Sequence, residues 1–215
     1  MKKTAIFLGI AALLSASFSS CSSKGASGET ETDNTLTVDS ILAQPDSFVG
    51  KTITVEGVVS HLCKHGGRKA FLLGSDENTM LRADATPGGY FTSFAPDCIH
   101  KPITLTGTLV ESRIDEAAVR EMEAQRAGQI QRVTEAAGEA DAANAEAAAQ
   151  QAEALKNAPA GCETERKAAG QSELATFAAQ MADYRARIAA RDSIEGKRYL
   201  STYYIQATSY SVLPE

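Results

Sequence analysis

Hydrophobic and polar residues alternate along several short stretches of the chain, which is the pattern of half-buried β-strands. In residues 52–59, Ile53 and Val55 alternate with threonine and glutamate, and Gly57 predicts a bulge or sharp bend. Glycine, proline, aspartate and asparagine gather between these stretches and predict turns. The pattern therefore predicts a short helix at residues 38–42 and five strands, at residues 52–59, 70–74, 79–83, 103–110 and 199–212.

Residues 115–192 differ from the rest, because alanine and charged residues dominate there and the apolar residues recur at helical spacing. A thin apolar stripe runs from Val119 to Ala140, and residues 157–161 interrupt the helical pattern. We expect two long helices folded back on each other, with Cys162 at the tip of the hairpin and tens of ångströms from the strands. The clearer stripe belongs to the second helix: Leu174, Phe177, Met181, Tyr184 and Ile188.

Five short strands with a bent first strand favour a small closed barrel. Two sequence segments resemble strands of OB-fold proteins of the anticodon-binding-like class: Thr54-Val55-Glu56-Gly57 and Leu105-Thr106-Gly107-Thr108-Leu109. The resemblance implies a five-stranded OB-like β-barrel. With the long α-helical hairpin inserted between strands 4 and 5, the predicted fold is α+β. We place the barrel at residues 36–114 plus 197–215 and the hairpin insertion at residues 115–196.

The N-terminal segment begins with Lys2 and Lys3 and continues with an apolar run over residues 5–14. The run is too short to span a bilayer and predicts a secretory signal. Small residues then lead to Phe18-Ser19-Ser20-Cys21, which resembles the lipobox of bacterial lipoproteins. Phe18 stands where leucine is usual, so the resemblance is to the relaxed form found in lipoproteins of the Bacteroidota.

This resemblance implies a signal peptide at residues 1–20 and a lipidated Cys21 that carries diacylglycerol and a further acyl chain such as palmitate. Three acyl chains anchor a protein firmly to a membrane. Ser22, where inner-membrane lipoproteins carry aspartate, implies sorting to the outer membrane, on its periplasmic or its surface face. The polar residues 21–35 predict a flexible tether. We expect the membrane to be contacted through this N-terminal lipid alone.

The chain is acidic, with a net charge of −6. The charge becomes −8 when the signal is removed, because Lys2 and Lys3 leave with it and no acidic residue does. Such a field argues against nucleic acid as the main partner. One loop is basic although the chain as a whole is acidic; it contains Lys64, Arg68 and Lys69. In an OB-fold this loop borders the ligand face, so these three residues are candidates for contact with an anionic ligand.

All three histidines lie within two residues of a cysteine. Cys-x-His occurs twice, as Cys63-Lys64-His65 and Cys98-Ile99-His100. Residues i and i+2 of a strand point to the same side, so each thiolate and imidazole can converge on one ion. Two sulfurs and two nitrogens suit zinc or copper. The candidate metal ligands are Cys63, His65, Cys98 and His100, with His61 beside them.

A disulfide between Cys63 and Cys98 is the alternative, because export to an oxidising compartment favours it. Such a bridge contributes about 2–4 kcal/mol to stability. Thiol redox chemistry stays open as a third use of these residues. With Cys21 acylated, three cysteines remain, so Cys162 is either a partner for an intermolecular disulfide or a buried thiol.

The sequence has no Gly-x-Ser-x-Gly, no phosphate-binding glycine-rich loop and no His-Glu-x-x-His. We therefore expect a lipid-anchored cell-envelope binding or interaction module without catalytic activity. The alternatives are a metal-handling lipoprotein that uses zinc or copper, and a module that binds nucleic acid or another polyanion through the OB face. The helical hairpin is expected to act as a spacer or as a coiled-coil docking arm for a protein partner or a second copy.

Overall fold

The computed structural model describes residues 35–64, 66–86, 91–138 and 142–214. The predicted signal peptide, the lipidation site Cys21, His65 and all of the predicted tether except Thr35 lie outside the described residues.

Five strands form a closed barrel: β2 (Thr52–Leu62), β3 (Lys69–Leu73), β4 (Met80–Ala85), β5 (Pro102–Asp115) and β6 (Tyr199–Val212). Their order is β2-β3-β4-β6-β5, and β2 also pairs with β5, which closes the barrel. The β4–β6 pair is parallel and the other barrel pairs are antiparallel. A short β1 (Leu36–Thr37) adds to β2 in parallel. This architecture confirms the predicted α+β fold with an OB-like barrel.

The barrel core follows from the alternation in the strands. On β5, Ile103, Leu105 and Leu109 are fully buried, and each contributes about 1.5–3 kcal/mol by leaving water. The helix α1 (Val38–Ala43) adds Val38 and Ile41 to the same core. Two 3-10 helices, η1 (Pro45–Ser47) and η2 (Pro96–Cys98), lie in the connections before β2 and between β4 and β5.

Two glycines allow close approach between strands. A Cβ on Gly107 would lie 2.4 Å from the backbone oxygen of Gln206, at the point where the β5–β6 register shifts. A Cβ on Gly57 would lie 3.2 Å from the Cβ of Leu72. The bulge that we expected at Gly57 is instead between Val59 and His61, where the β2–β3 register shifts.

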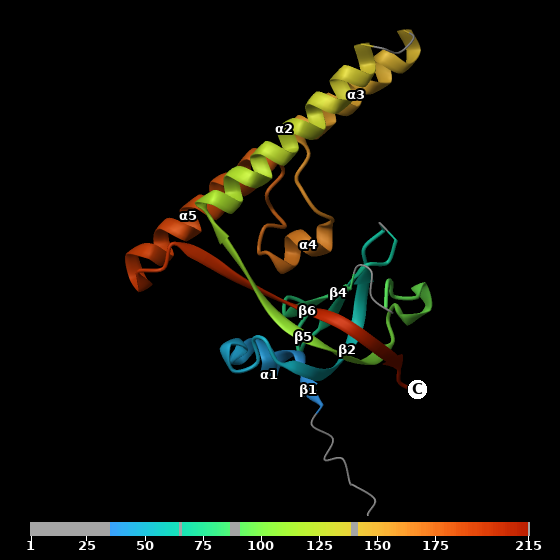
Figure 1. Cartoon of the computed structure of the whole chain (residues 1–215), viewed down its shortest axis with the longest axis vertical. Coiled ribbons are helices and arrows are strands. Elements are labelled where there is room, and N and C mark those ends of the chain that lie inside the picture. The colour runs from blue at the N-terminus through green and yellow to red at the C-terminus, as the bar shows by residue number, and fades with distance from the viewer. Residues whose placement is uncertain (1–34, 65, 87–90, 139–141, 215) are drawn as a thin grey trace, which may run out of the picture. The chain divides into compact units, whose positions relative to one another are not determined.

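The helical insertion is carried by a two-stranded ribbon. The β5–β6 pairing continues to Asp115 opposite Tyr199, and Figure 1 shows both strands running out of the barrel toward the helices. The insertion follows directly as α2 (Glu116–Gly138), α3 (Ala142–Asn157), α4 (Glu163–Ala168) and α5 (Phe177–Glu195). The insertion thus lies between the fourth and fifth barrel strands, as predicted. No helix in the described ranges is long and apolar enough to cross a membrane.

The internal layout of the insertion corrects the prediction of one simple hairpin. The two arms of the hairpin are α2 and α3, which lie side by side in Figure 1. The break at residues 157–161 is real, since α3 ends at Asn157, but the chain then runs through α4 before α5 begins at Phe177.

A second small core fixes α5 to α2. Val119 of α2 is buried against Met181 and Ile188 of α5, with Leu200 of β6 beside them. The predicted stripe is confirmed for the residues of α5, whereas Leu174 precedes the helix. The side chain of Arg185 also bonds the carboxylates of Glu116 and Glu123 on α2, at distances down to 2.8 Å. The second core and this ion pair hold α5 against α2.

We expect Gly107→Ala to lower the free energy of unfolding by about 2–4 kcal/mol, because the new methyl group meets backbone that cannot move aside. Urea denaturation followed by circular dichroism measures the effect. Gly128→Ala is the matched control: it lies on α2 near only a flexible arginine and is expected to stabilise by up to about 1 kcal/mol. Equal changes in the free energy of unfolding for the two variants would contradict the close approach of β5 and β6 at Gly107.

Candidate functional site

The residues of the two Cys-x-His motifs do not gather around one point in the part of the chain that the structure describes. Cys63 follows β2 and Cys98 lies in η2; both are buried, and no disulfide joins them. His100 is exposed and has a φ of 64°, and its backbone N–H donates to Val59 at 2.7 Å. Among the described residues, no group of three His, Cys, Asp or Glu side chains could hold a metal ion.

His61 lies on β2 with its ring 6.1 Å from that of Phe71, and its Nε2 is buried without a hydrogen-bond partner among the described residues. A metal site that includes His65 stays a prediction, because His65 lies outside the described residues. The disulfide between Cys63 and Cys98 also stays a prediction for the protein in an oxidising compartment.

Cys162 lies beside the barrel and not at the tip of the hairpin, which corrects our expectation. It is the N-cap of α4: its thiol accepts from the Glu165 N–H at 3.5 Å, and its own N–H donates to Glu165 Oε2 at 3.3 Å. The other oxygen of Glu165 lies 2.5 Å from Lys69 Nζ on β3. Because the chain turns back after α3, α4 reaches the barrel.

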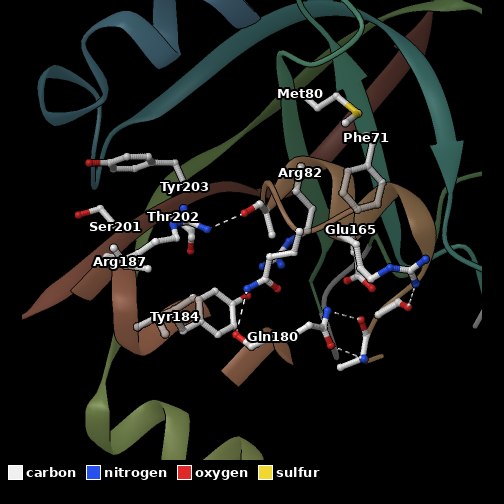
Figure 2. Close-up of a pocket in the computed structure, with 18 of the residues that line it drawn as sticks. Phe71, Met80, Arg82, Glu165, Gln180, Tyr184, Arg187, Ser201, Thr202 and Tyr203 are labelled. Atoms are coloured by element: carbon white, nitrogen blue, oxygen red, sulfur yellow. Dashed lines mark hydrogen bonds between the residues drawn. The ribbon is translucent and has the colours of Figure 1, made fainter. Parts of the chain in front are cut away.

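A cavity of about 740 Å³ lies between the outer face of β3 and β4, the start of β6, and the helices α4 and α5. Figure 2 shows Phe71 and Arg82 of the barrel on one side of this space and Tyr184 and Gln180 of α5 on another. The alternation of the strands places these barrel side chains outside, since their neighbours Leu72 and Ala83 fill the core. The insertion thus forms one wall of the cavity and the barrel another.

The cavity is cationic although the protein is acidic. Among the described charged residues that line it, Glu165 is acidic and four are basic: Lys69, Arg82, Arg166 and Arg187. Arg82 Nε lies 2.9 Å from Asp84 Oδ1, and the two side chains form an ion pair. The Nε of Arg166 is a buried donor without an acceptor among the described residues.

Burial and charge shift the acidic groups at the site in opposite directions. Burial raises the pKa of Asp84, although the positive charges of Arg82 and Lys69 oppose it. Burial also acts to raise the pKa of Glu165, but the hydrogen bond and charge of Lys69 outweigh it and hold that pKa below its usual range. Burial raises the pKa of Tyr184, so its phenol is neutral at physiological pH. Near neutral pH, Glu165 is therefore ionised, and it faces the cationic side chains.

Of the three predicted loop cations, Lys69 alone lines the cavity; it belongs to β3, whereas Lys64 and Arg68 lie exposed in the preceding turn. Sequence reasoning missed Arg82, Glu165 and the cavity residues of α5. The alternation Met80-Leu81-Arg82-Ala83-Asp84 was a usable signal for Arg82, because it places the charged side chains on the outer face of β4.

Comparison with known proteins adds little. No family model matches the chain, and no curated protein matches it in sequence. Among solved structures, a putative aspartyl-tRNA synthetase from Leishmania major Friedlin is similar over 40% of this chain and 17% of its own, at 21% identity and a TM-score of 0.29. A likeness of this size carries no argument about fold or function.

In reduced, folded protein we expect iodoacetamide to modify Cys162 well before Cys98. Cys98 is fully buried, and burial together with the charge of Asp97 raises the pKa of its thiol, so the reactive thiolate is scarce. Mass spectrometry of alkylated peptides over time measures both rates, and urea-unfolded protein, in which both react, is the control. Cys98 reacting as fast as Cys162 in folded protein would contradict its place in the core.

Proposed function

We propose that this protein is a lipid-anchored binding module of the cell envelope, without catalytic activity, that holds a compact anionic ligand between its barrel and its helical insertion. The observation that carries the proposal is the cationic cavity, where four basic side chains meet one acidic side chain among the described residues and Arg166 keeps a buried N–H without an acceptor. Buried donors without partners are rare in folded proteins because each costs about 1–3 kcal/mol. An oxygen atom of an anionic ligand would satisfy the Arg166 donor.

The shape of the cavity favours a small anion over a long polyanion. The outer face of β3 and β4 is where an OB-fold holds an extended strand of nucleic acid. Here α4 lies against that face, with Glu165 on Lys69. Phe71, the aromatic residue on this face, is 1% exposed and offers no stacking surface. The net charge of −6 also repels a polyanion at a distance.

The envelope location rests on the sequence around Cys21. The lipobox-like pattern supports acylation of this cysteine, and the polar residues that follow it support a flexible connection to the barrel. The hairpin of α2 and α3, whose surface is largely exposed, would act as a spacer or docking arm; its partner stays a prediction.

Pyrophosphate and citrate serve as probes of the cavity. At a probe concentration ten times the Kd, binding adds about 1.4 kcal/mol of stability, which raises the Tm by about 3–6 °C. We expect this shift in the mature protein purified from detergent-solubilised membranes, and its loss in Arg82→Gln. The matched control is Arg132→Gln, an exposed arginine on α2. The proposal is wrong if neither probe shifts the Tm beyond the effect of sodium chloride at equal ionic strength.

Lipidation is tested by labelling cells with radioactive palmitate. The wild-type protein is expected in the membrane fraction, processed and labelled. Cys21→Ser is expected to stay unprocessed and unlabelled, because the acyl acceptor is the thiol. Cys162→Ser removes a cysteine elsewhere and is expected to label like the wild type. Unprocessed, unlabelled wild-type protein in the cytosol would contradict the anchor.

A further inference from the structure

Residues 158–176, here called the strap, connect α3 to α5 and contain α4. The strap is fixed to α5 by amide side chains. Gln180 accepts from the Ala160 N–H at 2.6 Å and donates to its carbonyl at 3.2 Å, and Gln171 donates to Asp183 Oδ2 at 2.8 Å. Gln171 and Gln180 are 2% and 3% exposed, so separation from α5 would leave buried polar groups unpaired. The strap therefore moves with α5.

The polar attachment of the strap to the barrel is ionic. Lys69 Nζ on β3 lies 2.5 Å from Glu165 Oε1, and Lys167 Nζ lies 3.7 Å from Glu77 Oε2. These are the ion pairs that join strap and barrel in the described ranges. Glu77 is 91% exposed at its side chain, and an ion pair in water contributes little. Of these two ion pairs, Lys69–Glu165 is therefore the one that holds the strap against the barrel.

Glu165 brings a negative charge to a wall that is otherwise positive. Its carboxylate is ionised at neutral pH, since Lys69 holds its pKa below the usual range despite burial. The charge of Arg82 also acts on it. Glu165 thus occupies the position beside these two cations that the anionic group of a ligand would need.

We infer that Glu165 is a built-in competitor of the ligand: it holds Lys69 when the cavity is empty, and an anion that binds Lys69 displaces the Glu165 carboxylate from it. The inference rests on the proposed function, because it concerns the same cavity and an anionic ligand. It adds that affinity is set by exchange of one anion for another, and that the ligand takes over the ionic contact between strap and barrel.

Competition of this kind selects for ligand charge. A side chain tethered next to its partner acts at an effective concentration in the millimolar range. A ligand with one carboxylate only replaces the contact that Glu165 already makes. A ligand with two anionic groups can hold Lys69 and also contact a second cation of the cavity, such as Arg82. We therefore expect pyrophosphate to bind and acetate not to bind.

Titration calorimetry with pyrophosphate on the mature protein tests the competition. Glu165→Gln is expected to bind about three- to ten-fold more tightly than the wild type, because the competing charge is gone. Glu163→Gln removes the same charge from an exposed position on α4 and is expected to leave binding unchanged. In Lys69→Gln, binding is expected to weaken, and adding Glu165→Gln is expected to bring no further gain.

The second measurement needs no ligand. Cys162 is half-buried and is capped by Glu165, the residue that Lys69 holds, so we expect its rate of alkylation to report release of Glu165 from Lys69. We expect Lys69→Gln to raise this rate about two- to five-fold. Lys156→Gln, which breaks an exposed ion pair with Glu153 on α3, is the control and is expected to leave the rate unchanged.

The two measurements separate the two claims. An unchanged Cys162 rate in Lys69→Gln overturns the inference whether or not pyrophosphate binds. A raised rate without binding of pyrophosphate to any variant supports the ionic hold on the strap and overturns the proposed function. Binding that is equal in Glu165→Gln and the wild type supports the proposed function and overturns the competition.

Discussion

The long antiparallel pairing of β5 with β6 is the constraint on which the rest of the structure depends. Its inner part, together with the β2–β5 pairing, closes the barrel. Its outer part, up to Asp115 opposite Tyr199, brings the two ends of the helical insertion together. The entropy of closing a loop grows only slowly with its length, so a long insertion costs little more than a short one. The ribbon then determines which barrel face the helices approach.

Much of the barrel and little of the site could be predicted from the sequence. Strand alternation is local, so residues such as Ile53 and Leu105 identify their strands and their buried face without knowledge of the fold. The cavity depends instead on pairs such as Lys69 and Glu165, which lie 96 positions apart in the chain. The break at residues 157–161 was visible, but no local pattern tells whether such a break is a hairpin tip or a return to the barrel.

The cavity also shows how a local charge differs from the charge of the whole chain. The net charge of −6 determines only how strongly the protein attracts or repels a charged partner at long range. Inside the cavity, the groups that meet a ligand are Lys69 and three arginines, and the nearest compensating acids are Glu165 and Asp84. An acidic protein can therefore hold a small anion and still repel a long one, which is the selectivity that the proposed function requires.

The central claim is that barrel and insertion hold the ligand together, and hydrogen exchange measured by mass spectrometry tests it most directly. Addition of pyrophosphate to the mature protein is predicted to slow exchange in the peptides of β3 and β4 and in those of α5 at once, with the peptides of α3 unchanged. Protection confined to the turn at residues 63–68, or no protection in either half of the molecule, would contradict the account.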